Sequence, residues 1–165
     1  MGLQTFFCNV SSSAGVRQGL PMPSSSTVRR AIKHLEALLP GTPAEGPDGD
    51  LRWQRMLDLQ RFISSHPEEL WSFIVRWAKV PRTDLRDAVA CCLLEHLLEY
   101  HFVPFFPRVA EQAKSSRRFT DTLSRCYWMG EAAWPASARK LDRLLGSKRP
   151  RFRPRRPSTI ARTTT

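Results

Sequence analysis

Five residues able to bind a metal ion or to transfer a proton lie between positions 92 and 101. They carry one thiol, two carboxylates and two imidazoles: Cys92, Glu95, His96, Glu99 and His101. Cys92 and His96 are four positions apart, and so are Glu95 and Glu99, so a helix would place each pair on one side. All three kinds of group bind zinc, and a carboxylate beside an imidazole can also act in acid–base catalysis.

This pattern falls short of a metal-binding or catalytic motif. Zinc sites require three or four ligands, and the sequence contains neither HExxH nor Cys-x-x-Cys. The order HxxEH is followed from His96 to Glu99 but is broken at Tyr100, where a second histidine would stand. We therefore expect Glu95 and Glu99 to form a surface stripe and His96 and Cys92 to belong to the core. A metal site at Cys92, Glu95, His96 and Glu99 is the alternative.

No other stretch predicts an enzyme. The sequence has no nucleophile elbow, no phosphate-binding loop and no glycine-rich turn before a helix. We accordingly predict no catalytic residue, no cofactor and no bound metal ion.

The helix that must carry the five residues is predicted at 83–101. Thr83 can cap it, and Asp84 and Asp87 put negative charge in its first turn, where exposed backbone N–H groups favour it. Residues 88–94 contain no charge and no turn former. This composition predicts a central helix that is buried on nearly all sides. Its inner face would consist of Leu93, Leu94, Leu97, Leu98, Tyr100 and His101.

Apolar residues at helical spacing predict further helices on both sides of it. These are expected at 27–39, 50–64, 108–114, 117–129 and 135–145. A further helix is expected to begin at a capping box formed by residues 65–68. Residues 102–107 combine two prolines with three phenylalanines, so we expect a non-helical segment wedged into the core. The fold class predicted is all-α: an irregular bundle of antiparallel α-hairpins, HEAT-like in style, with about six to seven helices.

The five tryptophans are expected to pack between these helices. They are Trp53, Trp71, Trp77, Trp128 and Trp134. Trp71 is the exception, because it lies off the inward face of its own helix and would mark a surface for a partner.

The net charge of +11 is distributed unevenly over the 165 residues. Residues 147–165 contain seven basic residues and no acidic one, while residues 1–26 are rich in serine and contain little to bury. We therefore predict one helical domain at 27–146, between a disordered leader at 1–26 and a basic disordered tail at 147–165.

The cysteine pattern favours a reducing compartment. Cys91 and Cys92 are adjacent in a predicted buried helix and Cys8 lies in the leader, so no disulfide framework can be assigned. The first residues lack the features of a signal peptide, and we expect no apolar span of membrane-crossing length. A soluble cytoplasmic protein without membrane association is predicted.

The tail contains the residues most suited to binding an acidic partner or a nucleic acid. They are Lys148, Arg149, Arg151, Phe152, Arg153, Arg155 and Arg156. Prolines and charge repulsion would keep this stretch extended, guanidinium groups can pair with phosphates, and Phe152 could stack on a base. A solubilising terminus without a binding role is the equally weighted alternative.

Part of the chain resembles a small bacterial family of all-helical domains of unknown function. The matching residues fall within 84–130: 84–88, 94–98 with His101, Phe105 and Phe106, 109–113, Arg118 with Phe119, and Leu123 with 126–128. Members of that family show an acidic Leu-Leu helix, a His-Gly turn, an amphipathic helix and a terminal aromatic residue. Phe102 stands where the family has glycine. The resemblance implies an all-helical fold and a bacterial cytoplasmic setting, and it implies no activity.

These observations favour a non-enzymatic helical protein-interaction module, of an immunity or regulatory type, whose basic tail attracts an acidic partner. The alternative is a small nucleic-acid-binding protein that uses the tail. The third interpretation is an enzyme or metal site at Cys92, Glu95, His96 and Glu99.

Overall fold

Helices are the only regular elements in the part of the chain that the structure describes. The computed structural model describes residues 24–41 and 50–146. The all-α prediction is confirmed for these residues. The proposed tail, most of the proposed leader and most of the loop after the first helix lie outside them.

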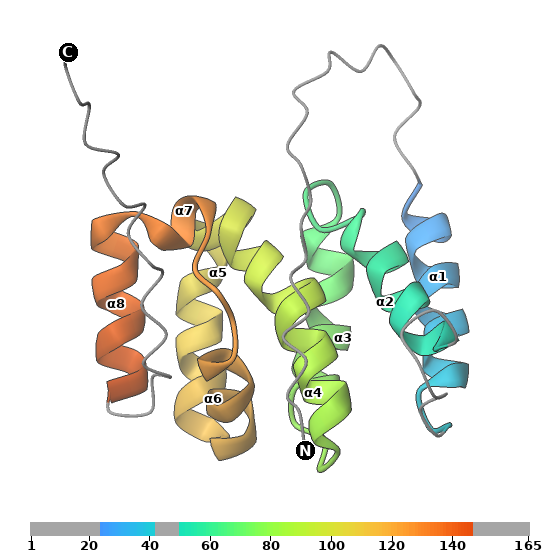
Figure 1. Ribbon diagram of the computed structural model, residues 1–165. Helices are drawn as coiled ribbons and strands as arrows, with labels where there is room; N and C mark the ends of the chain where they lie inside the picture. The colour runs from blue at the N-terminus through green and yellow to red at the C-terminus, as the bar shows by residue number, and fades with distance from the viewer. Residues whose placement is uncertain (1–23, 42–49, 147–165) are drawn as a thin grey trace, which may run out of the picture.

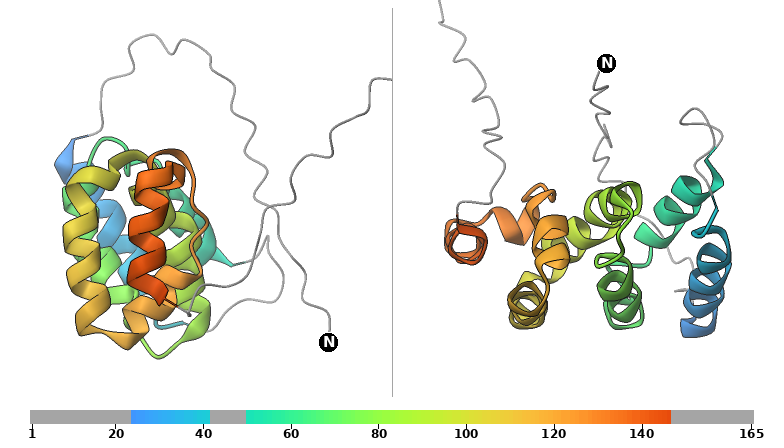
Figure 2. Two further views of the ribbon diagram at one scale, coloured as in Figure 1. Left: turned by 90° about the vertical axis from the view of Figure 1, so that its left-hand side faces the viewer. Right: turned by 90° about the horizontal axis from the view of Figure 1, so that it is seen from below.

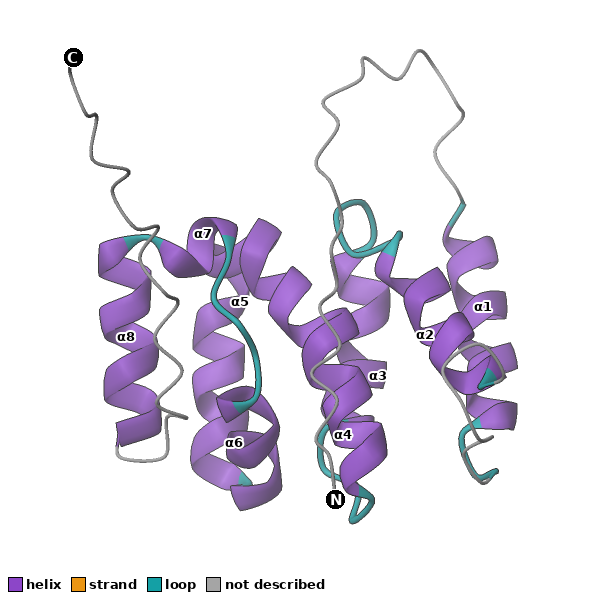
Figure 3. Cartoon of the chain, viewed as in Figure 1, coloured by secondary structure: helices purple, strands orange, loops and turns teal. Residues whose placement is uncertain are grey.

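The elements follow one another along the chain with short connections (Figures 1 and 3). They are α1 (Ser25–Leu38), α2 (Leu51–Gln60), α3 (Pro67–Trp77), α4 (Thr83–Val89), the π-helical turn η1 (Ala90–Leu94), α5 (Glu95–Ser115), α6 (Arg117–Ser124), α7 (Gly130–Ala133) and α8 (Pro135–Leu145).

The first six α-helices form stacked hairpins in two rows. Helices α1, α3 and α5 pack in sequence along one row, and α2, α4 and α6 pack along the other. The rows are visible from below in Figure 2, with α1, α3 and α5 on one side and α2 and α4 facing them. Helices α7 and α8 cover the end of the stack by packing on α5. This arrangement matches the expected antiparallel α-hairpins in HEAT-like style.

A continuous helical run made of α4, η1 and α5 passes through the centre of the fold. Its leucines Leu93, Leu94, Leu97 and Leu98 are buried, as the sequence predicts. The prediction that Tyr100 lies on the inner face is wrong, because 49% of its surface is exposed. The prediction that Glu95 lies at the surface is also wrong, because this residue is only 7% exposed.

The burial of Glu95 follows from an early end to α6. The sequence predicts a helix up to residue 129, whereas α6 ends at Ser124. The backbone N–H of Tyr127 donates to Glu95 Oε2 at 2.9 Å instead of to a carbonyl of its own helix. The chain after Cys126 therefore lies along α5 and covers the side that carries Glu95 and Glu99.

Residues 102–107 are helical, which corrects the expected non-helical wedge. Helix α5 is kinked at His101 (φ −137°, ψ 39°) and restarts at Phe102. Pro104 then falls in a first turn, where a backbone N–H has no helical partner to lose. Phe102 and Phe105 are nevertheless buried in the core, so the prediction that this segment inserts there is confirmed.

Five further expectations at helix ends and faces need correction. Thr83 does not cap the central helix, whose N-cap is Arg82 without a side-chain hydrogen bond. Trp134, expected to pack between helices, is 57% exposed.

Helix α1 begins at Ser25, capped by Ser24, so the predicted leader extends too far. The capping box at 65–68 is absent, since His66 precedes α3 without a side-chain cap and Ser65 bonds to the His66 ring. Trp71 is only 7% exposed because its ring packs on Phe105 and Phe119.

The helical run Thr83–Ser115 is long and apolar enough to span a membrane by length and composition, contrary to the sequence-based expectation. Its most apolar 18-residue window has a mean hydropathy of 1.2, and 56% of that window is buried inside the fold. The central helix of a soluble protein has the same properties, so this feature carries little weight for a membrane location.

Candidate functional site

The polar residues of α5 meet Gln60 of α2 in one cluster. We call Gln60, Glu95, His96, Glu99 and Tyr100 the α5 cluster. The His96 ring lies between its polar neighbours, with Nδ1 2.7 Å from Glu99 Oε2 and Nε2 2.8 Å from Gln60 Nε2. Glu95 Oε1 is 3.9 Å from His96 Nε2. Three of the four proposed metal candidates are therefore neighbours in space.

Burial decides the proton affinity of the carboxyl group of Glu95. Removal from water raises the pKa of Glu95 to about 7, and the charge of Glu99 adds to the rise, while the hydrogen bond from the Tyr127 N–H opposes it. Burial also raises the pKa of Tyr100, whose ring stacks on His96 with centroids 6.4 Å apart. A carboxyl group that titrates near neutrality is a common feature of functional sites and also of buried structural pairs.

Cys92 and His101 do not join this cluster. Cys92 is buried in the hydrophobic core, and His101 Nε2 is 3.1 Å from the backbone carbonyl of Ile63. Cys126 is a further buried cysteine, and its pKa is raised by burial and by the charges of Glu95 and Cys91. Its thiol therefore stays protonated and donates weakly to Ala90 O.

The polar groups of the α5 cluster bond to other groups of the protein. Within 24–41 and 50–146, no three His, Cys, Asp or Glu side chains are grouped so that they could hold a metal ion. Its groups are instead used inside the protein: Gln60 and Glu99 position the His96 ring, and Glu95 receives the Tyr127 N–H. The arrangement ties α2, α5 and the segment after α6 together.

Arginine and aspartate side chains connect the helix ends. Arg52, which is buried, donates to both oxygens of Asp50, to the Gly41 carbonyl and to Asp84. The hydrogen bond from Arg52 is the main reason why the pKa of Asp50 is lowered. These bonds join the end of α1 to the starts of α2 and α4.

A second set of ion pairs joins α4 to α6. The buried Arg86 donates to the carbonyls of Val80 and Pro81 and to Asp121. Arg125 pairs with Asp121 and with Asp87. Asp121 thus receives two guanidinium groups.

A larger share of the described acidic side chains than of the described basic ones takes part in ion pairs. Acidic residues paired with arginine include Glu36, Asp50, Asp58, Glu68, Asp84, Asp87 and Asp121. Exposed basic residues that form no ion pair among the described residues include Arg30, Lys33, Lys114, Arg117, Arg118, Arg139 and Arg143. The described surface therefore carries unpaired positive charge on α1, at the α5–α6 turn and on α8.

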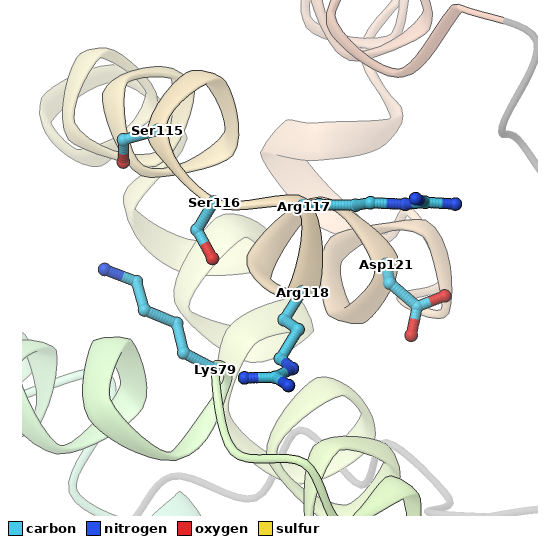
Figure 4. A pocket seen from close by; sticks show the side chains of 6 residues that line it. All are labelled: Lys79, Ser115, Ser116, Arg117, Arg118 and Asp121. Carbon is cyan, nitrogen blue, oxygen red and sulfur yellow. The ribbon is translucent and has the colours of Figure 1, made fainter.

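One open cavity lies within this positive surface, with a volume of about 570 Å³ (Figure 4). It is lined by Lys79, Ser115, Ser116, Arg117, Arg118 and Asp121. A smaller cavity of about 180 Å³ lies beside Arg52 and Met56. The larger cavity was not predicted from the sequence, although two serines followed by Arg117 and Arg118 indicate a helix that starts with positive charge.

Comparison with protein-family models, curated proteins and solved structures finds no match. The resemblance to a bacterial helical family therefore stays a prediction. The tail residues Lys148 to Arg156 lie outside the described residues, so the structure does not test their role.

Proposed function

We propose that this protein is a non-enzymatic helical module that docks an acidic protein partner. The observation that carries the proposal is the charge left over after pairing: among the described residues, ten of 18 basic side chains form no ion pair, whereas seven of 13 acidic side chains pair with an arginine. Electrostatic complementarity of this kind raises the association rate and selects partners of opposite charge. The arginine-rich stretch 148–156 would add long-range attraction.

Exposed aromatic side chains favour a protein as the partner. Tyr100, Tyr127 and Trp134 are 49%, 50% and 57% exposed, respectively. Tyrosine and tryptophan are enriched at protein interfaces because each has a large apolar body and a polar tip. A cytoplasmic setting and an immunity or regulatory role belong to this proposal.

A nucleic-acid-binding protein is the second candidate, and the sequence of the tail favours it. Seven basic residues with no acid in 147–165 could follow a phosphate backbone. In that case the helical domain would position the tail, and a chain that ends at Gly146 would lose binding.

The two candidates can be separated with fluorescent polyglutamate as an acidic polypeptide probe. We expect the full chain to bind it and a chain ending at Gly146 to retain measurable affinity, because unpaired cations remain on α1, α6 and α8. Complete loss of polyglutamate binding in the shortened chain, with its helical content unchanged, would contradict a docking surface on the domain.

A further inference from the structure

The cavity of about 570 Å³ separates the end of α3 from the turn between α5 and α6. In Figure 4 Lys79 and Arg118 come from opposite sides of the cavity below Ser116, with their charged ends directed differently, while Arg117 points away. Two positively charged side chains from distant parts of the sequence thus line one cavity together with a serine hydroxyl group.

The two cations have hydrogen-bonding capacity to spare. Lys79 Nζ donates to Gln112 Oε1, which uses one of the three donors of an ammonium group. Arg118 is exposed and forms no ion pair with any described residue. Both side chains can therefore donate to a ligand without breaking an internal ion pair.

Asp121 lines the cavity but does not neutralise it. Its Oδ2 accepts from Arg86 at 3.0 Å and from Arg125 at 3.1 Å. In Figure 4 its carboxylate points away from Lys79. Because two other guanidinium groups hold Asp121, the charge of Lys79 and Arg118 remains uncompensated in the cavity.

The backbone beside these cations adds donors. Ser116 caps α6 by accepting from the Phe119 N–H at 3.3 Å, and its own O–H remains available to donate. The first N–H groups of a helix have no intrahelical acceptor, and this end of the helix attracts negative charge. These groups act in addition to the two side-chain cations.

We propose that this cavity binds a phosphate monoester on a serine or threonine side chain of the protein partner. The inference rests on the proposed docking function and specifies the chemistry that the partner presents. A phosphate monoester offers about two negative charges and three acceptor oxygens, which match an ammonium, a guanidinium and a hydroxyl group. A carboxylate offers only one negative charge. A nucleic-acid backbone would need a continuous row of cations, and the acidic Asp121 interrupts such a row on one side of the cavity.

The test uses the full chain and a short fluorescein-labelled glycine peptide with a central phosphoserine. The double variant Lys79→Met with Arg118→Gln removes both cavity cations, and neither residue forms a described ion pair. The matched control is Arg139→Gln with Arg143→Gln, which removes two exposed charges from α8. We expect the cavity variant to bind the phosphopeptide about tenfold more weakly, and the control to lose less than about twofold.

Four outcomes would overturn the phosphate proposal. These are equal losses in both double variants, no loss in either, equal binding of the unphosphorylated peptide, or equal binding of a glutamate peptide. Tighter binding of a DNA oligonucleotide, lost in the cavity variant, would assign the cavity to nucleic acid instead. Polyglutamate binding is measured with the same proteins to separate the two proposals. If polyglutamate binding is retained, the docking function stands even when the phosphopeptide results contradict the phosphate site.

Discussion

The buried carboxylate of Glu95 accepts a hydrogen bond from the backbone N–H of Tyr127 at 2.9 Å. This bond holds the chain that follows α6 against α5. Gly130 then contacts Glu99, and Glu131 reaches Phe102. One side of the central helix is thereby closed by a segment that the sequence alone predicts to be helix.

The stability of the protein should depend on pH through Glu95. Burial raises the pKa of this carboxyl group from 4.5 to about 7. The folded protein therefore holds the proton more tightly than the unfolded chain, and stability is lost as pH rises from about 4.5 through 7. At about 1.4 kcal/mol per pKa unit, the loss is on the order of 3 kcal/mol. Urea unfolding of the wild type and Glu95→Gln at pH 5 and pH 7.5 measures it.

Glu95→Gln should abolish most of that pH dependence, because the amide does not titrate and its oxygen can still accept from the Tyr127 N–H. The same difference in stability between pH 5 and pH 7.5 in the variant and the wild type would show that another group is responsible.

Gly130→Ala should destabilise the fold by ~2–3 kcal/mol. Gly130 has a φ of +48°, and an added Cβ would lie 2.6 Å from the Glu99 carbonyl oxygen. Gly146→Ala is the control, since Gly146 also has a positive φ of 55° but a Cβ there meets nothing within 4 Å. Chemical denaturation of both variants compares steric clash with conformational strain, and equal losses would argue against close packing of Gly130 on α5.

Arg86→Met should cost ~3 kcal/mol or more. The buried guanidinium donates to two backbone carbonyls and to Asp121, and methionine leaves all three acceptors without this donor. Arg55→Met serves as the control because Arg55 forms only an exposed pair with Asp58 on α2, a kind of pair worth ~0.5 kcal/mol. Thermal unfolding that ranks the two variants equally would contradict the structural role of Arg86.

Glu131→Ala should lower stability by ~1 kcal/mol, whereas Glu131→Gln should recover most of the loss. The reason is that Glu131 Oε2 accepts from the Phe102 N–H at 2.8 Å, at the kink where α5 restarts. Hydrogen exchange at the Phe102 amide provides the direct measurement. Unchanged protection in Glu131→Ala would mean that this N–H has another acceptor.

Local signals in the sequence define most of the helices. Asp50 caps α2, Pro67 opens α3, and Pro135 and Gly146 bound α8, as predicted. Each of these residues acts within one turn of its own position, through a fixed φ, a side-chain acceptor or a positive φ. Such effects need no knowledge of the rest of the chain.

The remaining features depend on contacts between distant segments. The path of the chain after α6 involves Glu95, and the burial of Trp71 involves Phe105. Lys79 and Arg118 line one cavity only because α3 packs beside the α5–α6 turn. Helical spacing gives the face of a residue but not its neighbour, so the sequence predicted Glu95, His96 and Glu99 on one helix but neither their contact with Gln60 nor the burial of Glu95.

Salt-dependent binding of the full chain to single- and double-stranded DNA tests the docking account most directly. If the partner is an acidic protein, DNA binding should be weak, independent of sequence and lost by about 0.2 M salt, since only screened charge attraction contributes. Binding that depends on DNA sequence, or that remains tight at that salt concentration, would contradict the account and assign the protein to nucleic acid.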